Sequence, residues 1–478
     1  MTHTLFRKKP ILAPTATEGQ TQTSALKRVL GPFDLILFGV GAIIGTGIFV
    51  LTGIVAAEKT GPALVLSFIL AGLACAFAAM CYAELASMVP GSGSAYTYSY
   101  SAFGEIVAWV LGWDLMLEYG LACASVASGW SGYFQGLLAG FGIHLPQAIS
   151  SAYNPVHHTL VDLPAVLIML AVTTLLSRGI RASARVNAAM VLLKVGIVLL
   201  FIVVGAFYVK PANWSPFMPF GFSGVTAGAA TIFYAYIGFD AVSTAAEEVK
   251  NPQKHLPIGI LGSLVVATVL YMTVSLVLTG MVPYVRLDVK DPVAYAVQVV
   301  HLNWIAGLIS LAAIIGITTV LIVMSYGQTR LLYSISRDGL LPSAFSAVDK
   351  RQTPVFSNWT TGIVVCAFAG FVPLDTLAEL VNIGTLFAFI TVSIGVLVLR
   401  RTHPNQPRPF RVPFAPVLPA LSVLFCGYLL VHLSRVTWVC FVVWLAFGLV
   451  VYFAFGHRHS RLASGAPASV VDPDRIHA

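Results

Sequence analysis

Long uninterrupted apolar runs dominate this sequence and limit what it can fold into. A helix needs about 20 apolar residues to cross the hydrocarbon core of a membrane, and we count twelve such segments. They span residues 33–57, 61–89, 103–137, 159–177, 183–208, 222–248, 257–283, 299–335, 354–373, 376–399, 415–433 and 435–456. Only 10% of the 478 residues are charged, which is too few to cover the surface of a soluble fold. The runs are continuous rather than alternating, which excludes a transmembrane β-barrel. The sequence therefore predicts an all-α polytopic membrane protein.

The charges in the loops support this count and set an orientation. If the N-terminus is cytoplasmic, most of the 27 Lys and Arg residues fall in cytoplasmic loops and tails, as the positive-inside rule requires. We therefore expect both termini in the cytoplasm. The net charge of +8 gives no reason to expect a nucleic-acid partner, because the basic residues lie in short loops and not along one face.

Signatures of enzymes are missing from the chain. It contains no phosphate-binding loop, no H-E-x-x-H zinc pair and no G-x-S-x-G nucleophile motif. The six cysteines lie in apolar runs without C-x-x-C spacing, so they indicate neither disulfides nor a zinc site. We expect no catalytic residues, no metal, no cofactor and no ATP-driven transport by this chain alone.

Glycines cluster in the first apolar segment. Gly39, Gly41, Gly45 and Gly47 fall within nine residues, and each should weaken a helix by about 1 kcal/mol relative to alanine. One interpretation is close helix packing through a G-x-x-x-G pair. The other is a helix broken near mid-membrane, which is tolerated only where the backbone is buried or lines a cavity.

The sixth segment has the same character. It contains the sequence FYAYIGFD at residues 233–240, which combines a glycine with the carboxylate of Asp240. Glycine-interrupted helices at corresponding positions of two repeats are typical of the binding site of secondary transporters. This pairing favours broken helices over simple packing.

Several short motifs carry a resemblance to a known family. They occupy residues 41–49 (GAIIGTGIF), 82–85 (YAEL), 90–96 (PGSGSAY), 112–119 (GWDLMLEY), 238–240 (GFD), 247–252 (EEVKNP), 327–330 (GQTR) and 337–342 (RDGLLP). With these motifs the chain resembles the amino acid–polyamine–organocation superfamily, close to the cationic amino acid transporter branch and its bacterial relatives. The likeness extends over nearly the whole chain.

The resemblance implies a fold of five plus five helices in an inverted repeat, with broken helices 1 and 6 and two added helices. The implied parts are an N-terminal cytoplasmic tail (1–32), a first repeat (33–208), a second repeat (222–399), helices 11 and 12 (415–456) and a C-terminal cytoplasmic tail (457–478).

The resemblance also implies a substrate site at the two breaks. The substrate carboxylate is expected at the amides of Gly45, Thr46 and Gly47, the positive end of a half-helix. The expected contacts of its ammonium group and side chain are Ala42, Ile43, Tyr234, Ala235 and Ile237. Tyr234 is expected to act as an aromatic gate, with a core or interfacial tyrosine as the alternative.

Lys194 lies in the middle of the fifth segment. An unpaired ammonium group there costs several kcal/mol, so it must be paired, solvated or neutral. By resemblance it looks like a replacement for a sodium ion between helices 1, 5 and 8, so no sodium is expected. Two roles stay open: a group that titrates during transport, and a fixed charge that bridges to the first helix.

Glu118 and Asp240 are further intramembrane ionisable residues, with Asp114 nearer the helix end and one turn from Glu118. We expect proton coupling from Glu118 and Asp240, with structural hydrogen bonding as the alternative. Glu84 and the Glu247–Glu248 pair are expected to be gate or loop contacts, or solvated charges.

Met324 is expected to form the floor of the side-chain pocket, with ordinary helix packing as the alternative. A methionine there shortens the pocket, which favours small neutral L-amino acids such as alanine.

We thus expect a secondary active amino acid permease of the bacterial cytoplasmic membrane, with proton-coupled symport by alternating access. The alternatives are a cationic amino acid transporter, an exchanger or a membrane amino-acid sensor. Membrane lipids are expected partners, while a small membrane peptide or a second copy stays open.

Overall fold

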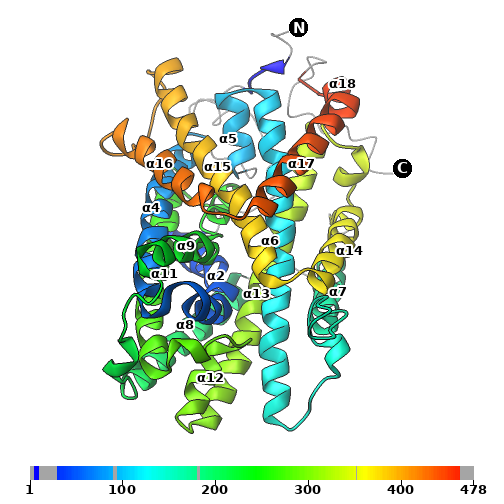
Figure 1. The fold of residues 1–478 in the computed structure, drawn as a ribbon. Coiled ribbons are helices and arrows are strands. Elements are labelled where there is room, and N and C mark those ends of the chain that lie inside the picture. The colour runs from blue at the N-terminus through cyan, green and yellow to red at the C-terminus, as the bar shows by residue number, and fades with distance from the viewer. Residues whose placement is uncertain (1–4, 10–29, 90–93, 180–183, 351–352, 463–478) are drawn as a thin grey trace.

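The computed structural model describes residues 5–9, 30–89, 94–179, 184–350 and 353–462, and within these ranges the chain is helical and forms no β-strand. The longest helices are α4 (Leu64–Met88), α6 (Glu105–Gly140), α8 (Ala184–Ala206), α11 (Pro252–Met281), α13 (Asn303–Arg337), α15 (Leu374–Thr402) and α17 (Arg435–Val451). Shorter apolar helices are α2 (Pro32–Ile43), α7 (Leu163–Ser177), α9 (Gly221–Ile232), α14 (Val355–Phe371) and α16 (Val417–Val431). Figure 1 shows them gathered into one bundle, with α6 and α13 running through most of its height.

Every apolar segment predicted from the sequence coincides with one or more of these helices. In the part of the chain that the structure describes, eight helical stretches are long and apolar enough to cross a membrane, and α2, α7, α14 and α16 are shorter apolar helices. The all-helical membrane architecture is therefore confirmed. The count of twelve crossings and the five-plus-five repeat stay predictions.

The helix starts follow from local sequence. Pro32 opens α2, and the Asp34 carboxylate accepts a 2.8 Å hydrogen bond from the Gly31 amide. The Asp162 side chain caps α7 by accepting a hydrogen bond from the Ala165 amide. Such caps satisfy amides that have no partner within the helix.

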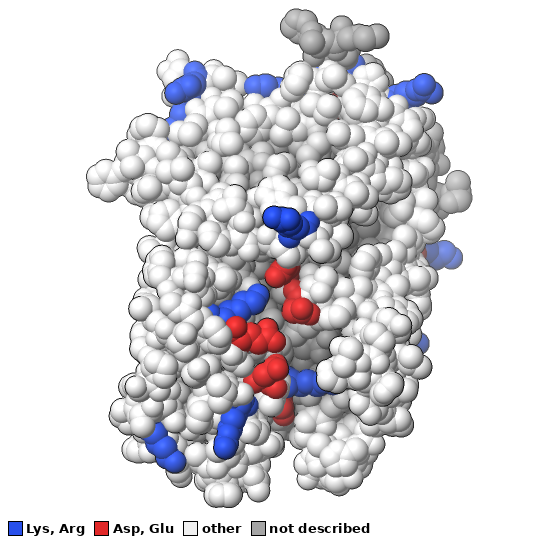
Figure 2. Space-filling model, viewed as in Figure 1, with Lys and Arg blue, Asp and Glu red and all other residues white. Residues whose placement is uncertain are grey.

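Large apolar side chains are distributed between a core and an outer surface. The core side chains between α4, α6, α11 and α13 are buried, whereas α8, α16 and α17 leave many apolar side chains exposed, among them Val203 and Val443. In Figure 2 the charged side chains gather at the two ends and in a hollow on the lower half of this face. An exposed apolar surface of this extent fits a lipid environment.

One end of the bundle carries the described parts of both termini. The Lys9 ammonium group forms an ion pair of 2.6 Å with Asp338, just after α13, and the Arg461 amide donates to the Asp338 carbonyl. Tyr96 of α5 (Ser94–Ala102), a helix that we did not predict, also donates to Asp338. We call this the termini end. The opposite end, which carries α12 (Pro292–Val299), is the α12 end (Figure 1).

Candidate functional site

The first apolar segment is a broken helix. The α2 helix ends at Ile43, and Ile44 has an extended backbone with φ −75° and ψ 100°. Helical structure resumes with a π-helical turn at Gly47–Leu51, followed by α3 (Thr52–Val55). The predicted break therefore exists, and the residues around it are buried, where a helix end leaves backbone groups without partners inside the helix.

The sixth segment is broken in the same way. After α9 a short 3-10 turn covers Phe233–Tyr236, Ile237 is extended, and α10 (Ala241–Thr244) follows. Gly238 lies between them with φ +117°, a conformation that favours glycine. A Cβ at Gly238 would lie 3.0 Å from the Ala42 carbonyl group, so the two breaks pack directly against each other.

A cavity of about 20 Å³ lies where the two breaks meet. Eight of the nine predicted substrate-site residues line it: Ala42, Ile43, Gly45, Thr46, Gly47, Tyr234, Ile237 and Met324. The ninth, Ala235, packs against the Gly47 backbone, where a Cβ would collide with it. The structure thus brings the predicted set together, and its role in substrate binding stays a prediction.

Four neighbours of this cavity were not predicted. Ala122, Val126 and Val320 line it, and they are indistinguishable in sequence from other apolar helix residues. The fourth is Tyr271 of α11, whose hydroxyl lies 2.9 Å from the Ile43 carbonyl and 2.8 Å from the Ala235 carbonyl. A tyrosine inside an apolar helix needs a polar partner, and this need was the one feature of the sequence that could have indicated Tyr271.

The polar groups of the cavity are few. The Tyr234 hydroxyl shares a hydrogen bond of 2.5 Å with Ser125 Oγ on α6. The Thr46 hydroxyl is buried, and it has no hydrogen-bond partner among the described residues. An unpartnered buried hydroxyl beside a cavity is available to a ligand.

Lys194 on α8 is completely buried and reaches the first break. Its ammonium group donates to the Gly41 carbonyl at 2.8 Å and to the Ile44 carbonyl at 2.9 Å, while its stem packs 3.4 Å from the Cβ position of Gly316 on α13. The charge therefore lies at the C-terminal end of α2, where a cation is favourable. Lys194 joins α2, α8 and α13, the helices between which it was expected.

The intramembrane carboxylates form a separate group. The Tyr119 hydroxyl donates to Asp240 Oδ2 at 2.9 Å. The other Asp240 oxygen and all the carboxylate oxygens of Asp114 and Glu118 are buried without a hydrogen-bond donor among the described residues. A Cβ at Gly384 of α15 would lie 2.7 Å from Asp114 Oδ1, so a glycine makes room for this group. Carboxylates in such surroundings need a proton or a cation.

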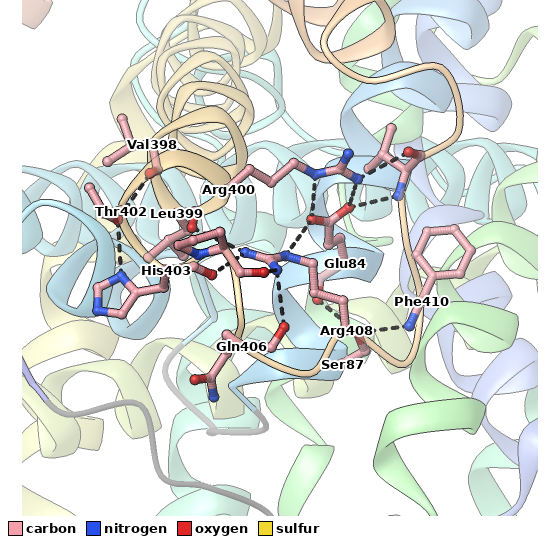
Figure 3. Close-up of polar contacts among 12 residues, drawn as sticks. Glu84, Ser87, Val398, Leu399, Arg400, Thr402, His403, Gln406, Arg408 and Phe410 are labelled. Carbon is pink, nitrogen blue, oxygen red and sulfur yellow. Dashed lines mark hydrogen bonds and ion pairs between the residues drawn. The ribbon is translucent and has the colours of Figure 1, made fainter.

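Glu84 is a loop contact rather than a solvated charge. Its buried carboxylate accepts hydrogen bonds from both Arg400 and the Val412 amide, and Arg408 lies 3.5 Å away (Figure 3). The cluster ties α4 to the end of α15 and to the chain that follows α15. Glu248 forms an ion pair of 3.3 Å with Arg330, while the Glu247 side chain and residues 90–93 of the PGSGSAY motif lie outside the described residues.

A second set of charges lies toward the α12 end. The Lys59 ammonium group donates to the Thr231 hydroxyl of α9 at 2.9 Å and lies 3.8 Å from the Glu379 carboxylate of α15. Thr437 of α17 also donates to Glu379. These contacts connect the second half of the first broken helix to α9 and α15, so the two ends of the bundle are tied by different ion pairs.

Comparison with known proteins places the chain in a family. Residues 30–455 match the family described as amino acid permease. A methylthioribose transporter of Bacillus subtilis is 55% identical over 96% of this chain and 99% of its own length. A branched-chain amino acid permease of the same organism is 53% identical over 97% of this chain and 100% of its own length. A vacuolar cationic amino acid transporter of Arabidopsis thaliana is 40% identical over 85% of this chain and 64% of its own length. The chain therefore belongs to the amino acid permease family of the amino acid–polyamine–organocation superfamily.

Proposed function

We propose that the chain is a proton-coupled symporter of small neutral L-amino acids that works by alternating access. The observation that carries this proposal is the cavity at the junction of the two helix breaks, where backbone polar groups meet apolar side chains. The proposal includes twelve membrane crossings, with the termini end in the cytoplasm and the α12 end outside.

The backbone offers both ends of an amino acid a partner. A helical segment starts at Thr46 and Gly47, and the first amides of a helix have no partner within it and lie at the positive end of its dipole. The Ile43 and Ala235 carbonyls share the hydroxyl of Tyr271, which has a single proton to donate. One of the two carbonyls is thus free at any time to accept from a substrate ammonium group.

The size of the cavity supports alternating access. A volume of about 20 Å³ holds about one water molecule and no amino acid, so substrate binding needs the helices to separate. The Lys9–Asp338 pair ties the termini end and the Lys59–Glu379 pair ties the α12 end. Opening toward either side breaks one pair and leaves the other intact.

Lys194 and the carboxylates support proton coupling. The charge of Lys194 stabilises the C-terminal end of α2 next to the substrate cavity. Loss of its proton would remove that charge and loosen the break that forms the site. Glu118 and Asp240 have carboxylate oxygens without a donor among the described residues, so they are candidates for taking up a proton on the way to the cytoplasm.

The walls of the cavity favour an aliphatic side chain. Val126, Ile237, Val320 and Met324 are apolar, and the described lining includes no charged side chain. The ammonium or guanidinium group of a cationic substrate would lack a partner there, which argues against lysine and arginine. We therefore propose alanine and the branched aliphatic amino acids as substrates.

A second candidate substrate is methylthioribose, because the methylthioribose transporter of Bacillus subtilis is 55% identical to this chain. Methylthioribose is a sugar thioether without an ammonium or carboxylate group. The Thr46 hydroxyl, which has no partner among the described residues, is the group that would favour such a ligand.

A competition experiment separates these candidates. The full chain, purified in detergent, is incubated with labelled L-alanine and a tenfold excess of unlabelled L-valine, L-leucine, L-arginine or methylthioribose. Displacement by L-valine and L-leucine but not by the other two is expected. Displacement by L-arginine would favour the cationic alternative, and displacement by methylthioribose alone would refute an amino acid as substrate.

A further inference from the structure

A larger cavity, of about 460 Å³, lies at the α12 end and is separate from the one at the helix breaks. Three parts of the chain line it: the last turns of α6, the segment 143–150 and the residues just before α12. Its size is within the range of about 300–1,000 Å³ that is typical of small-molecule sites.

Two glycines of α6 bring the segment before α12 into place. A Cβ at Gly132 would lie 2.9 Å from the Lys290 carbonyl oxygen, and a Cβ at Gly136 would collide with the Asp291 carboxylate. Since the two glycines are four residues apart, they lie on one face of the helix. Any larger residue at either position would push the 290–291 segment away from α6 and change the cavity.

Hydrogen bonds fix the opposite wall. The Lys290 ammonium group donates to the Ser150 carbonyl at 2.8 Å, and Gln135 of α6 donates to the same carbonyl at 2.8 Å. Gln135 also donates to the Ser131 hydroxyl, which in turn donates to the Asp162 carboxylate. The cavity is therefore built from connected polar contacts, and the charge of Lys290 has a fixed place in its wall.

The two charged residues in this cavity do not neutralise each other through a direct contact. Lys290 and Asp291 are adjacent in sequence and both line the cavity, but neither forms an ion pair within 4.0 Å in the described part of the chain. Burial raises the pKa of the Asp291 carboxyl to about 6, whereas the Lys290 side chain stays exposed to solvent. The Asp291 carboxyl has therefore lost more water than its neighbours replace.

We propose that this cavity is a second, peripheral binding site for the zwitterion of an α-amino acid, with Lys290 binding the carboxylate and Asp291 the ammonium group. The ligand class follows from the charges, because a molecule with one group of each sign satisfies both residues at once. The inference rests on the proposed function only for the orientation that puts this cavity on the outside.

The position of the cavity suggests how a bound ligand would affect transport. Leu287 and Pro292, on either side of the charged pair, press against Gly53 in α3, the second half of the first broken helix. A ligand held by Lys290 and Asp291 would fix this segment between α6 and α3 and so favour the arrangement that is closed at the α12 end. The expected effect is that high external amino acid slows uptake.

Binding stoichiometry tests the proposal. Labelled L-valine is titrated by equilibrium dialysis into the full chain in lipid nanodiscs, together with Lys290→Gln and Asp291→Asn. The matched controls are Lys210→Gln and Asp288→Asn, which change exposed charges of the same kinds at residues that do not line the cavity. Met324→Trp fills the cavity at the breaks and removes the central site.

The wild type and both controls are expected to bind two molecules of L-valine, while Lys290→Gln, Asp291→Asn and Met324→Trp each bind one. If the wild type binds one molecule of L-valine, and Asp291→Asn still binds one, the peripheral site is overturned. If the wild type binds one molecule, and Asp291→Asn loses that molecule while Met324→Trp keeps it, the peripheral site is supported and L-valine as a substrate of the central cavity is contradicted.

Two fragments of valine test the ligand class. Valinamide lacks the carboxylate and isovalerate lacks the ammonium group, so each is expected to displace L-valine from the peripheral site at least tenfold more weakly than L-valine itself. Full displacement by either fragment would mean that a single charge is recognised, and would overturn the zwitterion. The zwitterion proposal is also overturned if the wild type binds no L-valine at all.

Discussion

Replacing Lys194 by methionine removes one charge from the first helix break and leaves the side-chain stem nearly unchanged. The ammonium group makes two charge-assisted hydrogen bonds, at 2.8 and 2.9 Å, which together contribute about 3–6 kcal/mol. Burying an ammonium group costs several kcal/mol, so the two effects nearly cancel. The free energy of unfolding should therefore change by less than about 2 kcal/mol, because the methionine still packs against Gly316.

The effect of Lys194→Met on transport should be much larger than its effect on stability. A pH difference of one unit supplies about 1.4 kcal/mol for each proton, which gives tenfold accumulation for one proton per substrate. Two units, with the inside alkaline, should give a hundredfold ratio in wild-type vesicles. The variant should give a ratio near one, because the group that couples protonation to the break is gone.

Uptake of labelled L-alanine into proteoliposomes measures this ratio, and exchange against internal L-alanine checks that the variant still binds substrate. Lys210→Met, at an exposed lysine, is the matched control and should accumulate like the wild type. If Lys194→Met accumulates L-alanine to the wild-type ratio, and a protonophore abolishes that accumulation, the coupling role of Lys194 is refuted.

Three further substitutions test other parts of the structure. Gly47→Ala puts a Cβ against the Ala235 backbone and should abolish L-alanine uptake with a loss of about 1–3 kcal/mol in stability. Gly307→Ala on α13, where no atom lies within 4 Å of the added Cβ, should keep most of the uptake, and equal effects would contradict the packing argument. Met324→Ser enlarges the cavity floor and should let L-arginine compete for uptake; unchanged competition by arginine would count against a pocket limited by Met324. Asp162 caps α7 by accepting a hydrogen bond from the Ala165 amide, so Asp162→Ala should lower the free energy of unfolding by about 0.5–2 kcal/mol. Asp162→Asn keeps an acceptor and should cost less in thermal unfolding, and equal losses in the two variants would show that capping is not the role of Asp162.

The sequence predicted the elements of this fold well because membrane helices are strongly constrained. Apolar length alone located the helices, since a hydrocarbon environment leaves a backbone few other choices. The glycines at residues 39–47 and at 238 also predicted the two breaks, because a positive φ and close backbone contacts leave little room for another residue.

What the sequence could not predict depends on contacts between distant residues. Tyr271 bridges the two breaks from α11, but in sequence it is one tyrosine among 17. The pairing of Lys9 with Asp338 joins residues 329 positions apart. The cavity at Lys290 and Asp291 needs three separate segments to meet, and no local pattern in the loops marks it.

The most direct test of the central claim is the accumulation of labelled L-alanine in proteoliposomes of the wild-type chain, with and without an inward proton gradient. The account predicts concentrative uptake that rises with the gradient and collapses when a protonophore is added. Uptake that reaches only equilibrium whatever the gradient, or that needs amino acid inside the vesicles, would contradict proton-coupled symport and favour exchange.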